Sequence, residues 1–134
     1  GINIQVLSGS EEAQMIYEGI RLSGSLNGQT DLMMDIGGGS VEFIIGNNQE
    51  SLWKQSFEIG GQRLLELFHY HDPILPEEID KLESYLEEKL QPLIQAIQTY
   101  KPTGLVGASG TFDTLTDIYF ESMLPCIRTS SRRI

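Results

Sequence analysis

A strand that runs directly into three consecutive glycines limits the fold of this chain more than any other feature. The apolar run Leu32–Ile36 meets a loop at positions 37–40, which reads Gly-Gly-Gly-Ser, and a second apolar run, Val41–Ile45, follows at once. Consecutive glycines allow a tight backbone turn and a close approach to a ligand. The two runs are therefore predicted to be adjacent antiparallel strands, and the loop amides to form an anion-binding nest.

Asp35 adds chemistry to this loop because it stands between Met34 and Ile36 at the end of an apolar strand. Burying a carboxylate there is costly unless it holds a cation or accepts hydrogen bonds. An aspartate beside a loop that grips phosphate can hold Mg²⁺, directly or through water. The alternative is a glycine-rich hairpin turn with a capping aspartate.

The remaining pattern predicts a mixed sheet with flanking helices. A turn signal at 46–48 separates the second run from a third strand, so the three strands are predicted to form an antiparallel meander. The class is therefore α/β or mixed α+β, and a ribonuclease-H-like half is the favoured topology. The other predicted segments are a strand at 4–7, a helix capped by Ser10 and ending near Leu22, a third strand at 51–59, a helix after Gly60-Gly61, a helix from Pro76 that kinks at Pro92 and stops at Lys101, a strand at 105–106 and a helix to about Phe120.

Three further segments are candidates for chemistry. Glu12 lies in the first turn of the first helix, where an acid either complements the helix dipole or faces a cleft and takes a proton from water. Glu42 follows the loop and is either a solvent-facing strand residue or a second acid near the metal. The turn at 107–111 opens the last helix, so it is either an anion site or a plain connection. Its candidate phosphate-binding residues are Gly107, Ser109 and Gly110. His69 and His71 lack partners at ligand spacing, and a surface loop is favoured for them.

Composition excludes several classes of function. The 134 residues are 40% hydrophobic and 21% charged, which is typical of one globular domain. The net charge of −10 disfavours nonspecific binding to nucleic acid. No apolar run approaches the roughly 20 residues of a membrane span, and the N-terminus has no signal-peptide pattern. The single cysteine, Cys126, cannot form an internal disulfide, so a cytoplasmic location is expected.

Two motifs, separated by the first predicted helix, together resemble motifs of the exopolyphosphatase / guanosine pentaphosphate phosphatase family. One is Ser-Gly-Ser-Glu-Glu-Ala at 8–13, and the other is the run at 32–42 that contains the glycine loop. Residues 59–64 are similar to the family's Gly-x-x-Arg/Ser-Leu stretch, and residues 107–111 to its late Gly-Ala-Ser-Gly-Thr turn. The resemblance extends from about Ile4 to Tyr119. An Asp-x-Gly-Gly-Gly loop alone would be less specific, because sugar kinases, actin-like proteins and chaperone ATPases share it.

This resemblance implies an actin-like fold (the actin/hexokinase-like ATPase superfamily) of two ribonuclease-H-like lobes with a phosphate cleft between them. It implies Mg²⁺-dependent release of orthophosphate from the end of polyphosphate or from guanosine pentaphosphate. Glu12 maps to the family's catalytic base, and Asp35 and Glu42 map to the acids before and after the loop, here predicted to hold the metal. The residues that map to the phosphate-gripping loop are Gly37, Gly38, Gly39 and Ser40.

Two departures from the family pattern limit what the chain can do alone. Val41 stands where the family usually has Thr or Ser, and the family's first phosphate loop, Asp-x-Gly-Ser-Asn-Ser, is absent. We therefore expect a second-lobe fragment that is nearly inactive by itself. Residues 1–23 are expected to be the end of the first lobe with the crossover helix, 24–122 the second lobe, and 123–134 a frayed tail.

Two other interpretations remain open. A non-catalytic module of the same actin-like fold would sense nucleotide or phosphate without hydrolysing it, although the Glu11-Glu12 pair favours the enzyme. A structural lobe would instead mediate homodimer contacts through the helical region at 76–100. The choice between polyphosphate and guanosine pentaphosphate is expected to depend on residues outside this chain.

Overall fold

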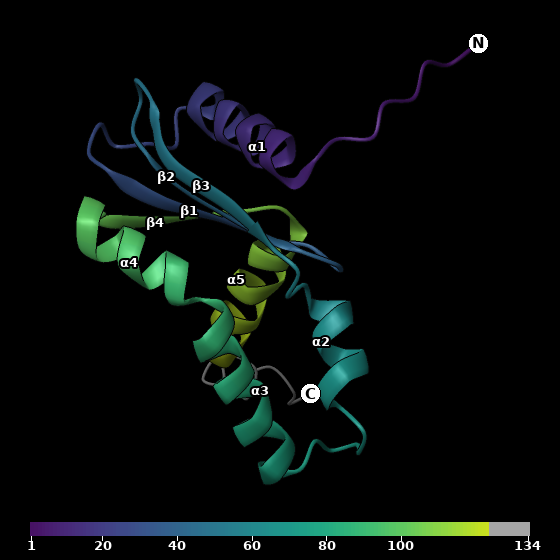
Figure 1. Cartoon of the computed structure of the whole chain (residues 1–134). Helices are drawn as coiled ribbons and strands as arrows, with labels where there is room; N and C mark the ends of the chain where they lie inside the picture. The colour runs from purple at the N-terminus through teal and green to yellow at the C-terminus, as the bar shows by residue number, and fades with distance from the viewer. Residues whose placement is uncertain (124–134) are drawn as a thin grey trace, which may run out of the picture.

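The sheet has four strands in the order β3-β2-β1-β4. In the computed structural model, which describes residues 1–123, these are β1 (Asp31–Ile36), β2 (Val41–Gly46), β3 (Ser51–Phe57) and β4 (Gly104–Ala108). The first three pair antiparallel, and β4 lies parallel to β1 at the edge. The predicted α/β class, mixed sheet and three-stranded meander are confirmed. Helix α1 lies on one side of the sheet, and α3, α4 and α5 lie on the other (Figure 1).

Helix α1 (Gly9–Ser23) covers one face of the sheet with an apolar stripe. Its buried residues Ala13, Tyr17 and Ile20 pack against Met33 of β1 and Ile44 of β2. The N-cap of this helix lies earlier in the chain than predicted. Ser8, not Ser10, is the N-cap, because the Ser8 hydroxyl accepts the amide of residue 11 and completes a capping box. This register fixes which side chain of the first turn faces the sheet.

The opposite face is covered by α3 (Pro76–Lys89) and α4 (Gln91–Tyr100), with Leu93 packed against Val41 and Phe57. A kink at Pro92 was the prediction, and the helix instead breaks into two at Leu90. Proline has no amide to donate to the carbonyl four residues earlier, and its ring crowds that carbonyl. The interruption therefore falls just before the proline, which becomes the second residue of a new helix.

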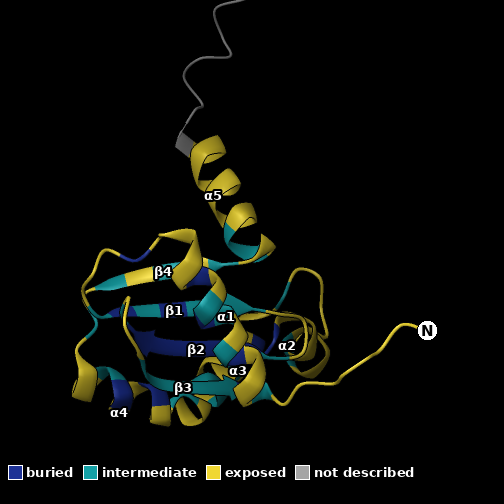
Figure 2. Ribbon diagram, turned by 90° about the horizontal axis from the view of Figure 1, so that it is seen from above, coloured by how far each residue is buried: buried dark blue, intermediate teal, exposed yellow. Residues whose placement is uncertain are grey.

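Two short connections carry the remaining helices. Helix α2 (Gly61–Phe68) follows β3, and α5 (Gly110–Met123) follows β4. Figure 2 shows burial concentrated on β2, whose residues are all buried, whereas α5 is mostly exposed. No helix within residues 1–123 is both long enough and apolar enough to cross a membrane.

One predicted strand and the end of another were wrong. The segment at 4–7 forms no strand, and the side chains of Ile4 and Val6 are 84% and 90% exposed. A β-prone run forms a strand only when it has a partner edge to hydrogen-bond with, and within residues 1–123 this segment has none. Strand β3 also ends at Phe57, two residues before the predicted end at Ile59. Apart from Met123, the predicted tail lies outside the described residues, as does Cys126.

Candidate functional site

The start of α2 holds the glycine loop by its carbonyl oxygens. The Gly61 amide donates to the Gly37 carbonyl at 2.9 Å, and the Gln62 amide donates to the Gly38 carbonyl at 2.9 Å. The Gly39 carbonyl accepts from the Gly60 amide at 3.1 Å and from Arg63 Nε at 3.0 Å. All three glycine carbonyls therefore face α2. Its N-terminal amides serve to orient the loop, so they are not open to a ligand.

The same hydrogen bonds leave three amides open on the other side of the loop. In a trans peptide the carbonyl and the following amide point in opposite directions, so the amides of Gly38, Gly39 and Ser40 point away from α2. None of these three amides donates to a protein acceptor within residues 1–123. The Gly37 amide is occupied, because it donates to the Ser40 carbonyl at 3.0 Å and closes the turn. The anion-binding capacity of the predicted loop therefore lies in residues 38–40.

Two glycines near the loop are needed for different reasons. A Cβ on Gly60 would lie 2.5 Å from the backbone of Gly38, so α2 could not approach the loop with any other residue there. A Cβ on Gly39 would meet no atom within 4 Å, and its φ is not in the left-handed region. The packing of residues 1–123 therefore does not require glycine at 39. Close approach of a ligand would require it.

Two acids lie side by side where the strands meet the loop. Asp35 and Glu42 are directly opposite in the β1–β2 ladder, so their side chains lie on the same face of the sheet. Alternation with Met33 and Ile44 places that face under α1. Glu42 is only 2% exposed, so the solvent-facing alternative for it is wrong. Its Oε1 accepts a hydrogen bond from Ser56 Oγ at 2.6 Å.

The two acids in the first turn of α1 have different environments. The Glu11 carboxylate accepts bonds from the Ser8 amide at 2.8 Å and the Ser8 hydroxyl at 2.7 Å, and these bonds lower the pKa of Glu11. The pKa of Glu12 is raised, first by the negative charge of Glu42, then by burial and by the charge of Asp35. Glu11 is therefore a capping residue, whereas Glu12 is close enough to the acid pair beside the loop for their charges to raise its pKa.

The turn from β4 to α5 lies beside Asp35. Ser109, whose φ of 66° is left-handed, donates its hydroxyl to Asp35 Oδ1, and Thr111 Oγ1 donates to the Ile36 carbonyl at 2.9 Å. Gly107 has no room for a side chain, since a Cβ there would overlap the ring of Phe112. The fold thus brings the predicted 107–111 turn next to the end of β1, with the Ser109 hydroxyl committed to Asp35.

Sequence reasoning gave no role to two residues of this region. Ser56 bonds Glu42, and Arg63 bonds both the loop and the Glu58 carboxylate. Strand alternation would have found Ser56, because it is the ladder partner of Glu42 across β2–β3. Arg63 stands in a motif, but no pattern shows that its side chain reaches back to the loop. An open cavity of about 350 Å³ beside it is lined by Gly38, Gly39, Gln62, Arg63 and Glu66.

The donor set near the loop is small. Within residues 1–123, no group of three or more His, Cys, Asp or Glu side chains is close enough to hold a metal ion. His69 and His71 are exposed and lie in the segment after α2, as predicted for a surface loop, and His71 Nδ1 lies 2.8 Å from Glu78 Oε1. Any divalent cation at the loop would therefore depend on Asp35 and Glu42 together with ligand oxygens and water.

Known structures share this architecture. An exopolyphosphatase from Cytophaga hutchinsonii is 48% identical and superposes with a TM-score of 0.85 over 94% of this chain and 40% of its own. The Aquifex aeolicus PPX-GPPA enzyme is 26% identical, with a TM-score of 0.74 over 90% of this chain and 38% of its own. These structures have the actin-like ATPase fold, which confirms the superfamily predicted from the motifs.

A curated relative and a family model agree with the structures. The guanosine-5'-triphosphate,3'-diphosphate pyrophosphatase of Aliivibrio fischeri strain MJ11 is 36% identical over 118 residues, which are 88% of this chain and 24% of that protein. The present chain therefore spans well under half of the relatives that it matches. The model of the Ppx/GppA phosphatase family matches residues 1–123. With its fold, its glycine loop and its paired acids in place, the chain belongs to the Ppx/GppA phosphatase family.

Proposed function

We propose that the protein carrying this chain hydrolyses the terminal phosphoanhydride bond of polyphosphate or of guanosine pentaphosphate and releases orthophosphate. Family membership and the names of two relatives, an exopolyphosphatase and a guanosine-5'-triphosphate,3'-diphosphate pyrophosphatase, support the reaction class. The observation that carries the proposal is geometric. Three open amides of the loop at 38–40 follow the end of β1, and the first turn of α1, which carries Glu12, lies against Ser56 beside Glu42 at that same end of the sheet.

The loop is the part of the site that binds the phosphoryl group. Its amides at 38–40 are fixed before any ligand arrives, because α2 holds the three carbonyls of the same peptides. Fixed donors aimed at developing negative charge stabilise a phosphoryl-transfer transition state without a cost of reorganisation. The Ser40 hydroxyl lies at the end of the loop and adds a further donor.

Glu12 is the proposed general base. A carboxylate must be deprotonated to accept a proton from the attacking water, and a raised pKa makes it a stronger acceptor. The charges of Glu42 and Asp35 raise the pKa of Glu12, whereas Glu11 is committed to the helix cap. Glu12 orients the water and takes its proton while the loop holds the phosphoryl oxygens.

Asp35 and Glu42 are the residues proposed to hold Mg²⁺. Magnesium is bound by one or two protein carboxylates together with water and phosphate oxygens, which fits a pair of adjacent acids in place of a full protein cage. One oxygen of each acid is fixed by a serine hydroxyl, from Ser109 and Ser56 respectively. When bound, the ion would neutralise charge on the phosphate oxygens.

The share of its relatives that this chain spans bears on the activity expected of the chain in isolation. It spans 40% of one solved relative and 24% of a curated one. We propose that residues 24–122 form the second lobe of a two-lobed enzyme, with α1 as the crossover helix before it. Because a cleft between lobes binds phosphate from both sides, the isolated chain is expected to turn over very slowly.

The catalytic assignment is tested by comparing two neighbouring glutamates in the intact protein. Glu12→Gln should lower kcat for phosphate release by on the order of 100-fold to 10,000-fold, the range that general base catalysis supplies. Glu11→Gln should leave kcat near the parent value, since its side chain serves the cap. Equal losses in both variants would refute the assignment. Tight guanine-nucleotide binding without any phosphate release by the parent would favour a sensing module instead.

The loop assignment is tested by comparing two glycines whose Cβ positions are both open. Gly39→Ala and Gly61→Ala would each add a methyl group that meets nothing within 4 Å in the fold. If phosphate lies against the loop, Gly39→Ala should raise KM and lower kcat/KM by about tenfold or more, while Gly61→Ala changes them little. Matched unfolding temperatures would show that both variants fold. A Gly39→Ala variant with parent kinetics would remove the loop from the phosphate site.

A further inference from the structure

Ser56 lies under the catalytic end of α1 and is paired with a buried acid. It is directly opposite Glu42 in the β2–β3 ladder, and its hydroxyl donates to Glu42 Oε1 at 2.6 Å. Within residues 1–123, the buried side-chain oxygens that have neither a partner nor solvent contact are both on Asp31. The second oxygen of Glu42 has no hydrogen-bond partner among these residues, so it keeps contact with solvent. Ser56 thus holds one oxygen and leaves the other free.

The start of α1 rests on the same serine. A Cβ built on Gly9 would lie 2.6 Å from Ser56 Cβ and 2.8 Å from Ser56 Oγ. Gly9 is the first residue of α1, three residues before Glu12. Any longer side chain at position 9 or 56 would push the helix away from the sheet. The small size of both residues therefore sets how closely the first turn of α1 approaches β3.

We propose that Ser56 is a positioning residue of the phosphatase site, which fixes the Glu42 carboxylate by its hydroxyl and seats the turn of α1 that carries Glu12. The inference rests on the proposed function, because it gives Ser56 a purpose only if these two glutamates act on one phosphoryl group. Its hydroxyl sets the direction of the Glu42 carboxylate, and its size sets the height of Glu12 above that carboxylate. Ser56 itself does not touch the substrate.

Two substitutions separate the hydroxyl from the size. Ser56→Ala removes the donor without adding size, whereas Ser56→Thr keeps the hydroxyl and adds a methyl group where α1 approaches the sheet. If the hydrogen bond matters, Ser56→Ala should lose about tenfold in kcat, the order that one hydrogen bond to a charged group supplies, with KM changed less than twofold. Ser56→Thr should lower kcat and the unfolding temperature because it displaces the first turn of α1. An Ala variant with parent kcat would overturn the role of the hydroxyl, and a Thr variant with parent kcat and stability would overturn the role of the size.

Lys54 offers a matched control for the seating of α1. Its ammonium group donates to the Gln14 side chain, so it also ties β3 to α1, but it has no hydrogen bond to Glu42. Lys54→Met should leave kcat near the parent value. A loss as large as that of Ser56→Ala would mean that any loosened contact between the helix and the sheet lowers turnover, which would contradict a specific role for Ser56.

A double-mutant cycle with Glu42→Leu, which leaves no oxygen to accept from Ser56, decides whether Ser56 acts through Glu42. Interacting residues show non-additive effects, whereas independent ones add. In kcat, Ser56→Ala should cost much less in the Glu42→Leu background than in the parent, and full additivity would refute the proposal. The same cycle on chemical unfolding tests the hydrogen bond without any assay of turnover. Coupling in stability together with an absence of phosphate release by the parent would mean that the proposed function fails while the contact stands.

Discussion

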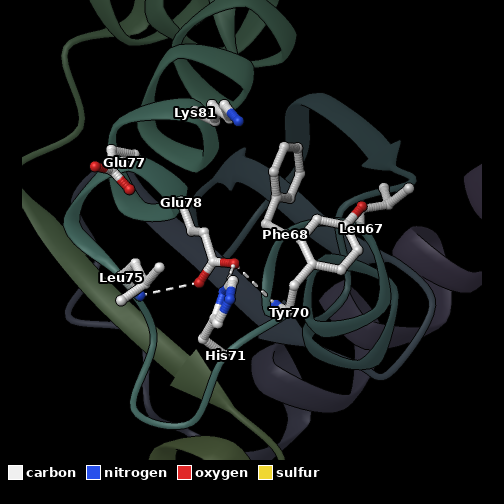
Figure 3. Close-up of a pocket in the computed structure, with 8 residues that line it drawn as sticks. All are labelled: Leu67, Phe68, Tyr70, His71, Leu75, Glu77, Glu78 and Lys81. Atoms are coloured by element: carbon white, nitrogen blue, oxygen red, sulfur yellow. Dashed lines mark hydrogen bonds and ion pairs between the residues drawn. The ribbon is translucent and has the colours of Figure 1, made fainter.

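Glu42 and Glu78 are both buried glutamates, 2% and 6% exposed, but the fold treats them in opposite ways. Glu78, near the start of α3, accepts from the Tyr70 amide at 3.2 Å and the Leu75 amide at 2.9 Å, and His71 Nδ1 lies 2.8 Å away (Figure 3). Within residues 1–123, Glu42 accepts one bond, from Ser56. One carboxylate has both oxygens engaged, and the other has an oxygen to spare.

We propose that this difference separates a structural acid, Glu78, from an acid that takes part in the reaction, Glu42. The Leu75 amide, the His71 side chain and the Tyr70 amide hold the pKa of Glu78 below its usual range, so Glu78 stays ionised and ties the 69–75 loop to α3. The negative charge of Glu42 instead raises the pKa of the neighbouring Glu12. Burial is common to both acids, so it does not distinguish them. The number of hydrogen bonds that each carboxylate accepts does.

The surroundings of Glu78 and of the glycine loop differ in a similar way. A cavity of about 440 Å³ near Glu78 is lined by Leu67, Phe68, Tyr70, His71, Leu75, Glu77, Glu78 and Lys81. The sticks in Figure 3 show its buried carboxylate turned toward the loop that it binds. That hollow has a structural acid in its wall, whereas the glycine loop presents amides that nothing in the described fold uses.

The largest expected difference between the two acids is in turnover. Glu42→Gln is expected to lower kcat for phosphate release by on the order of 100-fold, because it removes one of the two carboxylates proposed to hold the cation that would neutralise phosphoryl charge. Its stability should change by no more than about 1 kcal/mol, since the amide oxygen can still accept from Ser56. Glu78→Gln is the control and should keep the parent kcat. Similar kcat values for both variants would mean that a carboxylate oxygen without a hydrogen-bond donor does not mark the functional acid.

The two variants are expected to rank in the opposite order when stability is measured in place of turnover. Glu78→Gln places an amide nitrogen against backbone donors, so it should lower the unfolding temperature more than Glu42→Gln does. The sign with pH follows from a lowered pKa in the folded state. The contribution of Glu78 is present at neutral pH and is lost as the pH falls through its folded-state pKa. Thermal unfolding of the parent and variant from neutral to acid pH should therefore converge, and a gap that widened in acid would contradict this account.

A smaller effect should appear in the titration of Glu12. Its raised pKa comes first from the charge of Glu42, so Glu42→Gln should lower the pKa of Glu12, while Glu78→Gln should leave it unchanged. Carbon NMR of the labelled side chain, recorded without divalent cations, measures this directly. If the pKa of Glu12 is the same in the parent and in Glu42→Gln, the two acids are not neighbours in solution.

The smallest effect is expected for His71→Ala. It removes one of the groups around Glu78 but leaves both backbone donors in place. The unfolding temperature should fall less than in Glu78→Gln, and kcat should not change. A loss greater than that of Glu78→Gln would show that the imidazole, not the backbone, is the main support of the 69–75 loop.

Much of the fold could be predicted because local pattern and tertiary pairing agree there. The apolar runs around the glycine loop and the turn at 46–48 predicted the meander, and the antiparallel pairing of β2 with both β1 and β3 confirms it. The segment at 4–7 failed because β-propensity cannot supply a partner edge. The break before Pro92 was misplaced by two residues because proline acts on the turn that precedes it.

The candidate site, like the fold, could be predicted from the sequence only in part. The sequence by itself determined the residue types: a glycine loop at the end of an apolar strand, an acid on each side of it, and a pair of glutamates at a helix start. Tertiary structure alone decided which groups are free. Hydrogen bonds between distant segments engage the carbonyls of the glycine loop and one oxygen of Glu42, and only folding brings those donors and acceptors together. Chemistry depends on what such bonds leave unused, and no spacing in the sequence records it.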